Sequence, residues 1–190
     1  MAATIKNQRY NAVLDYWFGP DRQNPKEDYD LWYGGAPETD AYIKQEFGSE
    51  LVAAEKGELD EWMGDKFAAV AFIVVLDQFA LNVYRDMPKG FEVSATAIPR
   101  SYDAIARGYD KQIPKAMTGF VYMPLMHSEQ LKDQEKCVQL FFELDGKGSE
   151  FAVEHRDIVK KYGRFPGRNV VHGRESTPEE LEYLKNGGVF

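Results

Sequence analysis

The sequence predicts an all-α protein: one domain over residues 1–190, in which about seven to nine helices stack together. Apolar side chains recur with helical spacing in every long segment, and no stretch alternates apolar and polar residues as a half-buried strand does. A chain of 190 residues buries roughly 70% of the surface that its unfolded form exposes. The composition, 44% hydrophobic and 14% aromatic, is typical of a globular protein.

The amino-terminal half contains helical segments that end near glycine or proline, where helices commonly stop. We expect these helices over residues 7–18, 37–56, 65–85 and 91–107. The central helix, 65–85, has the clearest apolar stripe, at i, i+4, i+7 and i+11, formed by Phe72, Leu76, Phe79 and Val83. Pro99 is expected to kink or interrupt the fourth helix, because proline removes a backbone donor.

Three more helices are expected in the carboxy-terminal half. Pro124 suits a first helical position, so it is expected to begin a helix over residues 124–144. A helix over residues 149–162 should end at Gly163 in a left-handed cap. Thr177 and Glu180 have the spacing of a capping box and predict a short last helix.

Charge and composition exclude several classes of protein. The net charge of −8, from 31 acidic and 23 basic residues, argues against a uniformly basic nucleic-acid binder. The single Cys137 excludes an intramolecular disulfide and a multi-cysteine metal site, and mid-helix it reads as a buried apolar residue. Residues 1–9 have no signal-peptide core, and the longest apolar run, 67–76, is too short to span a membrane. We therefore expect a soluble, cytoplasmic protein with neither nucleic acid nor membrane as partner.

A polar stripe at the end of the central helix is not explained by packing. Gln78, Asn82 and Arg85 stand at i, i+4 and i+7 and so share a face, beside Asp77. Buried amides and guanidinium groups are costly unless they are hydrogen-bonded. The stripe is therefore either one wall of a ligand pocket or a structural network that ties helices together.

Two of the three histidines lie on apolar helical stripes. His127 is in register with Leu131, Gln134, Val138 and Phe141, and His155 with Phe151, Ile158 and Tyr162. We expect both rings to be mostly buried in one side-chain network, with His127 near a helix N-terminus. Such a pair could transfer protons or bind a metal, and each could equally be a hydrogen-bonded core histidine. Glu129 lies on the other side of the expected helix, which argues against a simple chelate.

The loop after Gly163 offers a third group of polar side chains. Arg164, Arg168 and Asn169 stand beside glycines, and arginine forks suit carboxylate or phosphate. The alternative is that these arginines cap helix carbonyls or pair with acidic residues and serve stability alone. The sequence has neither a glycine-rich phosphate loop nor a nucleophile elbow.

These motifs, taken in order, resemble those of the DUF924 family. The matching strings include Leu76-Asp77-Gln78-Phe79, Tyr122-Met123-Pro124-Leu125, Gly163-Arg164-Phe165-Pro166 and Ser176-Thr177-Pro178-Glu179-Glu180. The resemblance implies a tetratricopeptide-like stack of helices but no reaction, because the family is named for its unknown function. Leu81 and Gly167 stand where members usually have Arg and His, so a shared ligand site would be changed here.

The function we expect is a pocket for a small anionic molecule, with His127 and His155 as catalytic groups. The expected binding residues are Asp77, Gln78, Asn82, Arg85, Glu129, Arg164, Arg168 and Asn169. Two alternatives stay open: a non-catalytic helical scaffold that binds a protein or peptide, and a metal- or haem-binding protein that uses the two histidines. We assign no cofactor, no metal site and no oligomeric state, and leave open whether the protein is an enzyme.

Overall fold

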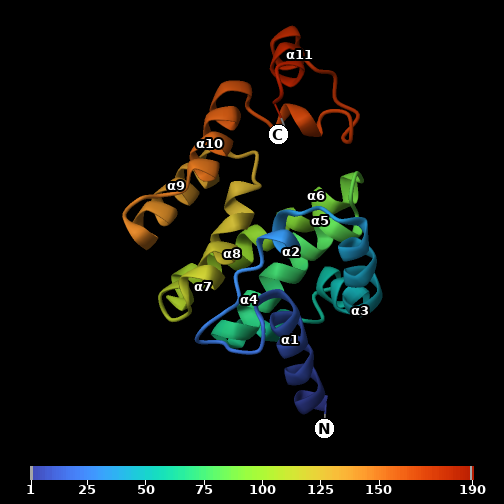
Figure 1. Ribbon diagram of the computed structural model, residues 1–190, viewed down its shortest axis with the longest axis vertical. Helices are drawn as coiled ribbons and strands as arrows, with labels where there is room; N and C mark the ends of the chain where they lie inside the picture. Colours follow the sequence, from blue (N-terminus) through green and yellow to red (C-terminus); the bar gives the residue numbers. More distant parts are fainter. Residues whose placement is uncertain (1, 189) are drawn as a thin grey trace. The chain divides into compact units, whose positions relative to one another are not determined.

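The structure is a computed structural model that describes residues 2–188 and 190, with side chains described from residue 9 onward. The described residues form helices, turns and loops and no strand, which confirms the all-α prediction (Figure 1). The chain divides into two compact units: one takes in the chain up to residue 85 together with 89–124, the other residues 86–88 together with 125–190. The tetratricopeptide-like stacking stays a prediction.

The first unit contains most of the helices. In chain order they are α1 (Ala2–Phe18), α2 (Tyr29–Tyr33), α3 (Pro37–Glu55), α4 (Lys66–Val74), α5 (Ala80–Val83), α6 (Pro88–Ala95), α7 (Ala97–Ala106) and α8 (Lys115–Met126). Helices α3 and α4–α5 lie where the sequence predicts them, and α1 ends as predicted but begins five residues earlier, at Ala2. The short helix α2 falls outside the helices that the sequence predicts; Asp28 caps its N-terminus by accepting a hydrogen bond from the Leu31 N–H.

The central helix of this unit is buried on all sides. Asp65 caps α4, and a π-helical turn, Val75–Phe79, joins α4 to α5, so the expected helix is present with one widened turn. Residues 68–80 are all buried. The window Lys66–Val83 is apolar enough to cross a membrane by length and composition, but 72% of it is buried inside the protein. A core helix of a soluble protein has this character.

Aromatic side chains from three other elements, α1, α2 and α8, pack around this helix. Phe79 contacts Trp17 of α1 edge to face, with ring centroids 5.4 Å apart. Phe120 of α8 contacts Trp17 and also Trp32 of α2, the latter at 4.9 Å. The Trp32 indole N–H donates to the Trp17 carbonyl at 2.9 Å, so its polar atom is satisfied. Burial of large rings therefore holds the first unit together.

Two prolines mark the boundaries of later helices, one as predicted and one not. Pro99 lies in the first turn of α7, and the chain breaks between α6 and α7 at Thr96, as expected for an interruption near proline. The prediction for Pro124 is wrong: it lies inside the last turn of α8 and does not begin a helix. The next helix, α9, starts only at Leu131. His127 therefore follows a helix C-terminus and does not lie near an N-terminus.

The second unit is smaller and has a smaller apolar core. Its elements are α9 (Leu131–Asp145), α10 (Glu150–Tyr162), the 3₁₀ turn η4 (Pro166–Arg168) and α11 (Pro178–Lys185). Gly163 caps α10 in the left-handed conformation, and the capping box at the start of α11 is present, as predicted. Ile158, Val159 and Phe165 form the buried cluster, with Tyr162, Tyr183 and Phe190 packed against it.

The buried face of α10 differs from the predicted stripe by one residue at its start. Phe151, expected to face the core, is 68% exposed, whereas Ala152 beside it is fully buried. The buried positions run through Ala152, His155, Ile158 and Val159. Helices α9 and α10 pack closely against each other, and a small side chain in the first turn of α10 permits that approach.

Candidate functional site

In the first unit, the predicted polar residues form a chain of hydrogen bonds that starts at a buried carboxylate. Asp77 is 1% exposed and lies in the π-helical turn; its oxygens accept hydrogen bonds from Ser94 Oγ at 2.5 Å and Gln78 Nε2 at 2.6 Å. Gln78 Nε2 also donates to the sulfur of Met123 at 3.2 Å. Turns of this kind are frequent at functional sites, and here the turn places a carboxylate in an apolar core.

The same chain of hydrogen bonds ends at the surface. Asn82 Nδ2 donates to the Gln78 carbonyl at 2.7 Å, and Arg85 donates to Asn82 Oδ1 at 3.3 Å. Arg85 also forms a two-point ion pair with Asp40 of α3, at 2.5 and 2.8 Å. Its carboxylate partner in these contacts is thus Asp40, on another helix. In these contacts the stripe acts as a network that ties α3 to α5.

In the second unit, the turn between α8 and α9 carries His127, and two side chains hold its backbone by hydrogen bonds. Gln134, fully buried in α9, donates from Nε2 to the carbonyls of Met126 and Ser128, each at 2.6 Å. Arg168 donates to the His127 carbonyl between them at 2.9 Å. Three successive carbonyls at the end of α8 are therefore paired with side chains. This fixes the backbone of His127 through contacts that do not use its ring.

Ser128 and Glu129 fix the rest of this turn. Ser128 Oγ donates to Asp133 at 2.7 Å and accepts from the Gln130 N–H at 3.1 Å. Such local side-chain bonds compete with helical backbone bonds, which explains why the helix expected over residues 124–144 is interrupted here. Glu129 accepts from the Phe165 N–H at 2.8 Å and so joins the turn to the arginine loop.

Glu129 also forms a two-point ion pair with an arginine that the sequence analysis did not select. Arg174 donates to both carboxylate oxygens of Glu129, at 2.7 and 2.9 Å. Burial alone would raise the pKa of Glu129, but the hydrogen bonds from Arg174 and from the Phe165 N–H outweigh it and hold the pKa below its usual value. Glu129 is thus an ionised anchor for the loop.

The other predicted arginine of the loop is also anchored. Arg164 donates to both oxygens of Glu180, at 2.7 and 2.8 Å, and Glu180 is 2% exposed. Asn169 and the Thr177 N–H donate to the same carboxylate. The bond from Arg164, and after it that from Thr177, lowers the pKa of Glu180 to about 2. In these contacts Arg164 and Asn169 hold α11 against the loop, the structural alternative stated for this motif.

His155 is buried, as predicted, while His127 is only half-buried. His155 Nδ1 donates to the Phe151 carbonyl at 2.7 Å, and its ring packs against Phe190 and Phe165, with centroids at 3.9 and 5.5 Å. The pKa of His155 is lowered to about 4, mainly by desolvation; electrostatic interactions with His127 and Arg168 act in the same direction, and the hydrogen bond to the Phe151 carbonyl opposes them. The imidazole is therefore neutral at neutral pH, with Nε2 as its acceptor atom.

The structure thus brings His127, Glu129, His155 and Arg168 together in the second unit. Arg164 and Asn169 are hydrogen-bonded to Glu180. The other four predicted binding residues, Asp77, Gln78, Asn82 and Arg85, belong to the first unit. Sequence reasoning missed the partners Gln134 and Arg174 as site residues. Gln134 could have been noticed as a polar residue inside an apolar stripe; Arg174 carries no such signal.

The described part of the chain gives little support to a metal-ion site or to a nucleophilic cysteine. Among residues 2–188 and 190, no group of three or more His, Cys, Asp or Glu side chains is arranged to hold a metal ion. Cys137 is buried, and burial raises its pKa to about 12. A thiol of that pKa is protonated at neutral pH and is not a nucleophile.

Comparison with known proteins places the chain in a family. Residues 13–188 match the profile described as a bacterial protein of unknown function, DUF924. The chain belongs to the DUF924 family. A solved structure, the protein of unknown function ATU0120 from Agrobacterium tumefaciens, is 30% identical and superposes with a TM-score of 0.84, over 98% of this chain and 100% of that one. No curated protein matches the chain.

The DUF924 match spans both units and so covers every predicted site residue. Two positions at which this chain departs from the family strings lie beside anchored residues. Leu81 is half-buried and precedes Asn82, and Gly167 is exposed in η4 next to Arg168. Neither comparison names a ligand or a reaction, so function has to be argued from the site.

Proposed function

We propose that this DUF924 protein binds a small anionic molecule, bearing a carboxylate or a phosphate, beside His127, and that His127 exchanges a proton with it. The observation that carries the proposal is the support of the His127 backbone by Gln134 and Arg168 through three successive carbonyls. Side chains held in one geometry by a supporting shell are what binding and catalytic sites need. The half-buried ring of His127 is the group that this support presents.

The charges of the second unit favour an anion at this place. Arg168 lies close enough to His155 for its positive charge to lower the pKa of that ring. The guanidinium of Arg168 also lies over the Phe165 ring, 4.3 Å from its centroid, which orients it. In a chain of net charge −8, such a local positive field attracts an anion specifically.

The two histidines have different roles in this proposal. A pKa of about 4 makes His155 a weak base, so at neutral pH its ring is uncharged and can only accept a hydrogen bond at Nε2. His127 lies half-buried in the turn after α8, partly open to solvent. His127 is therefore the group proposed to hold and transfer the proton.

The remaining predicted residues are supports in this proposal. Glu129, Arg164 and Asn169 hold the loop that carries Arg168. A role for Asp77, Gln78, Asn82 and Arg85 in binding the same ligand stays a prediction, as does a cytoplasmic location.

The direct test is a thermal-shift and calorimetric titration with inorganic phosphate and with succinate. The His127→Gln variant removes the ring but keeps every carbonyl contact of the turn, so its fold should be intact. Saturating anion should raise the melting temperature of the parent by about 5 °C and that of H127Q by much less. His172→Gln, a change of the third histidine, is the matched control and should behave as the parent.

Arg168→Lys separates charge from geometry, because lysine keeps the cation and loses the planar fork. We expect weaker anion binding with little change in the melting temperature of the free protein. If neither anion stabilises the parent, or if H127Q is stabilised equally, the proposal is wrong and the turn serves stability alone.

A further inference from the structure

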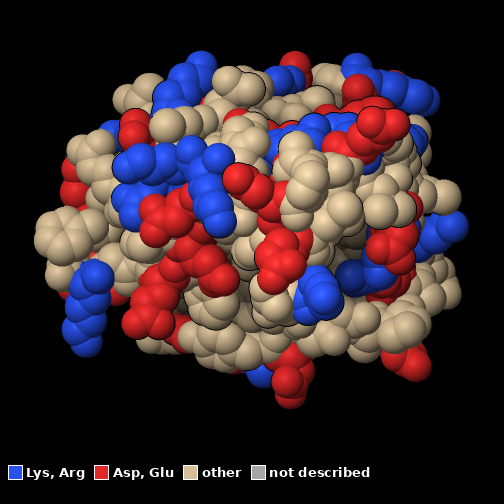
Figure 2. All heavy atoms as spheres, turned by 90° about the horizontal axis from the view of Figure 1, so that it is seen from above, with Lys and Arg blue, Asp and Glu red and all other residues tan. Residues whose placement is uncertain are grey.

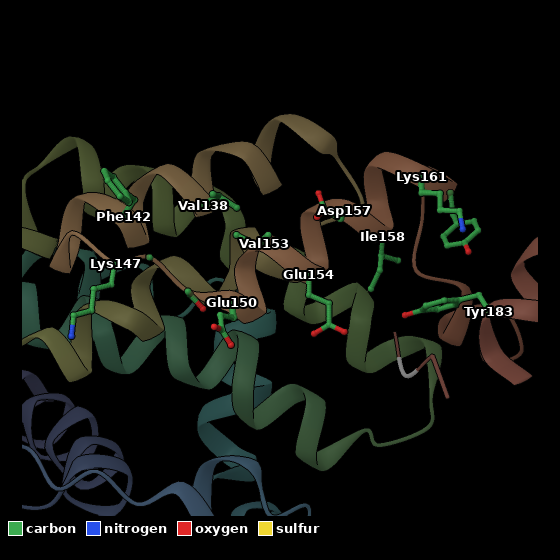
Figure 3. A pocket seen from close by; sticks show the side chains of 13 residues that line it. Val138, Phe142, Lys147, Glu150, Val153, Glu154, Asp157, Ile158, Lys161 and Tyr183 are labelled. Atoms are coloured by element: carbon green, nitrogen blue, oxygen red, sulfur yellow. The ribbon is translucent and has the colours of Figure 1, made fainter. Parts of the chain in front are cut away.

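A second surface of the carboxy-terminal unit has the features of a docking groove. It is an open hollow of about 620 Å³ along α10, bordered by α9 and by Tyr183 of α11 (Figure 3). Its floor is apolar and is formed by Val138, Phe142, Val153, Ile158 and Tyr183. Phe142 is 59% exposed and Val153 38% exposed, so large apolar side chains face solvent along this groove. Contiguous apolar surface of this kind is typical of interaction sites.

Acidic side chains border the apolar floor. Glu150 and Glu154 stand one helical turn apart on α10, and Figure 3 shows them projecting to the same side. A second hollow of about 660 Å³ continues past Tyr183 and adds Glu179 and Glu182 of α11. Among the described residues that line the two hollows, the basic ones are Lys147 and Lys161, at opposite ends of the first hollow in Figure 3.

We propose that this groove docks a basic amphipathic helix of a partner protein. The apolar floor matches an apolar stripe, and the acidic border matches Lys or Arg beside that stripe. Helix α10 has 13 residues, so the groove suits between three and four turns of a partner helix, roughly 20 Å. Charge disfavours a second copy of this chain, because each copy has a net charge of −8.

On the face drawn in Figure 2, basic and acidic side chains lie interspersed, without one large area of a single sign. A basic helix would therefore be guided by the local acidic border together with the apolar floor, and not by bulk charge alone. The inference is independent of anion binding at His127, so H127Q should bind the helix as the parent does.

The test uses a fluorescein-labelled synthetic helix of about 14 residues, roughly 20 Å long, with leucine on one face and lysine on the other. Fluorescence anisotropy should show saturable binding to the intact protein. Phe142→Ser should weaken binding roughly tenfold. Phe151→Ser, a change of an even more exposed phenylalanine on α10 outside the groove, should leave it unchanged.

Charge is tested with a second pair of variants. Glu154→Gln should weaken binding about two- to fivefold and reduce its salt dependence, whereas Glu135→Gln, exposed on α9 away from the groove, should not. A matched helix with glutamate in place of lysine should not bind. The proposal is overturned if F142S binds as the parent does, if the acidic helix binds equally, or if light scattering shows a dimer that F142S dissociates.

Discussion

The two units of this protein are held together in different ways. The first has a wholly buried helix, residues 68–80, that is apolar except at Asp77 and Gln78 and is surrounded by aromatic rings. The second has a buried cluster of Ile158, Val159 and Phe165, and its loop and last helix are fixed by Glu129 and Glu180. The comparison teaches that polar motifs, chosen from the sequence as candidate site residues, stabilise the fold of the second unit.

The difference has a measurable consequence, because apolar burial is insensitive to pH while buried ionisable groups are not. The two groups whose pKa values are lowered to about 4 and about 2, His155 and Glu180, both lie in the second unit. All three tryptophans, Trp17, Trp32 and Trp62, lie in the first. Tryptophan fluorescence therefore reports on the first unit, while circular dichroism reports on all helices.

The largest expected effect is in the aromatic core of the first unit. Phe79→Ala removes a fully buried ring that contacts Trp17 and Phe47, and should lower the free energy of unfolding by about 4 kcal/mol. Urea unfolding followed by tryptophan fluorescence measures this. The loss should be the same at pH 5 and pH 7; a loss that depends on pH would contradict the apolar account of this unit.

The next effect is the pH dependence that His155 gives the second unit. The pKa of this ring is about 4 in the folded chain and 6.5 in the unfolded chain, so the unfolded state binds the proton first as pH falls. Stability from this group is complete above pH 6.5 and falls by about 3 kcal/mol as pH falls from 6.5 to 4. His155→Asn keeps a donor for the Phe151 carbonyl and should flatten this slope.

The readout is the free energy of unfolding at several pH values between 7 and 4, by circular dichroism. His172→Gln is the control and should keep the parent's slope. An unchanged slope in H155N would show that the ring is accessible to water in the folded protein.

A smaller effect is expected from the carboxylate that anchors the last helix. Glu180→Gln removes the charge bound by Arg164 and should lower stability at pH 7 by about 2 kcal/mol. The pKa of Glu180 is about 2 in the folded chain against 4.5 unfolded, so this stability is present above pH 4.5 and lost as pH falls toward 2. E180Q should therefore approach the parent at pH 2.

Hydrogen exchange locates this loss. In E180Q, faster exchange is expected in peptides from residues 164–188, with peptides from residues 68–80 unchanged at short times. Equally accelerated hydrogen exchange in both segments would mean that the Arg164–Glu180 ion pair does not stabilise the second unit locally.

The smallest effect is expected at the exposed ion pair of the first unit. Asp40→Asn removes the partner of Arg85, whose side chain is 44% exposed, and should cost less than about 1 kcal/mol. The melting temperature should change by at most a few degrees and less in 1 M salt. A large loss of stability would show that this polar stripe is essential to the first unit, and would contradict the difference proposed between the two units.

Much of the fold follows from the sequence, because glycine, proline and capping residues identify helix ends locally. Gly163, Thr177 with Glu180, and Pro99 each act as the sequence predicts. Pro124 misled the prediction because proline is also tolerated near a helix end. The break after α8 is stabilised by the local bonds of Ser128 and by the contacts of Gln134 with two carbonyls, neither of which helical periodicity shows.

The site was predictable in its residue types but not in its pairings. The choice of His127, Glu129, Arg168 and His155 rests on polar residues in unusual positions, and the structure does bring these four into one unit. Which carboxylate binds which arginine depends on segments 16 to 45 residues apart in sequence. Phe151 shows the same limit: the exposed and buried sides of α10 are set by how closely α9 approaches, which periodicity alone does not give.

The central claim is that the ring of His127 is available to a ligand, whereas the ring of His155 is structural. The most direct test is the ¹⁵N spectrum of the three histidines during a titration with inorganic phosphate. The account predicts saturable shifts of the His127 ring nitrogens. It also predicts that His155 stays a neutral, Nδ1-protonated ring from pH 8 down to pH 5, because its pKa is about 4. Phosphate-dependent shifts confined to His155 or His172, or protonation of His155 near pH 6.5, would contradict it.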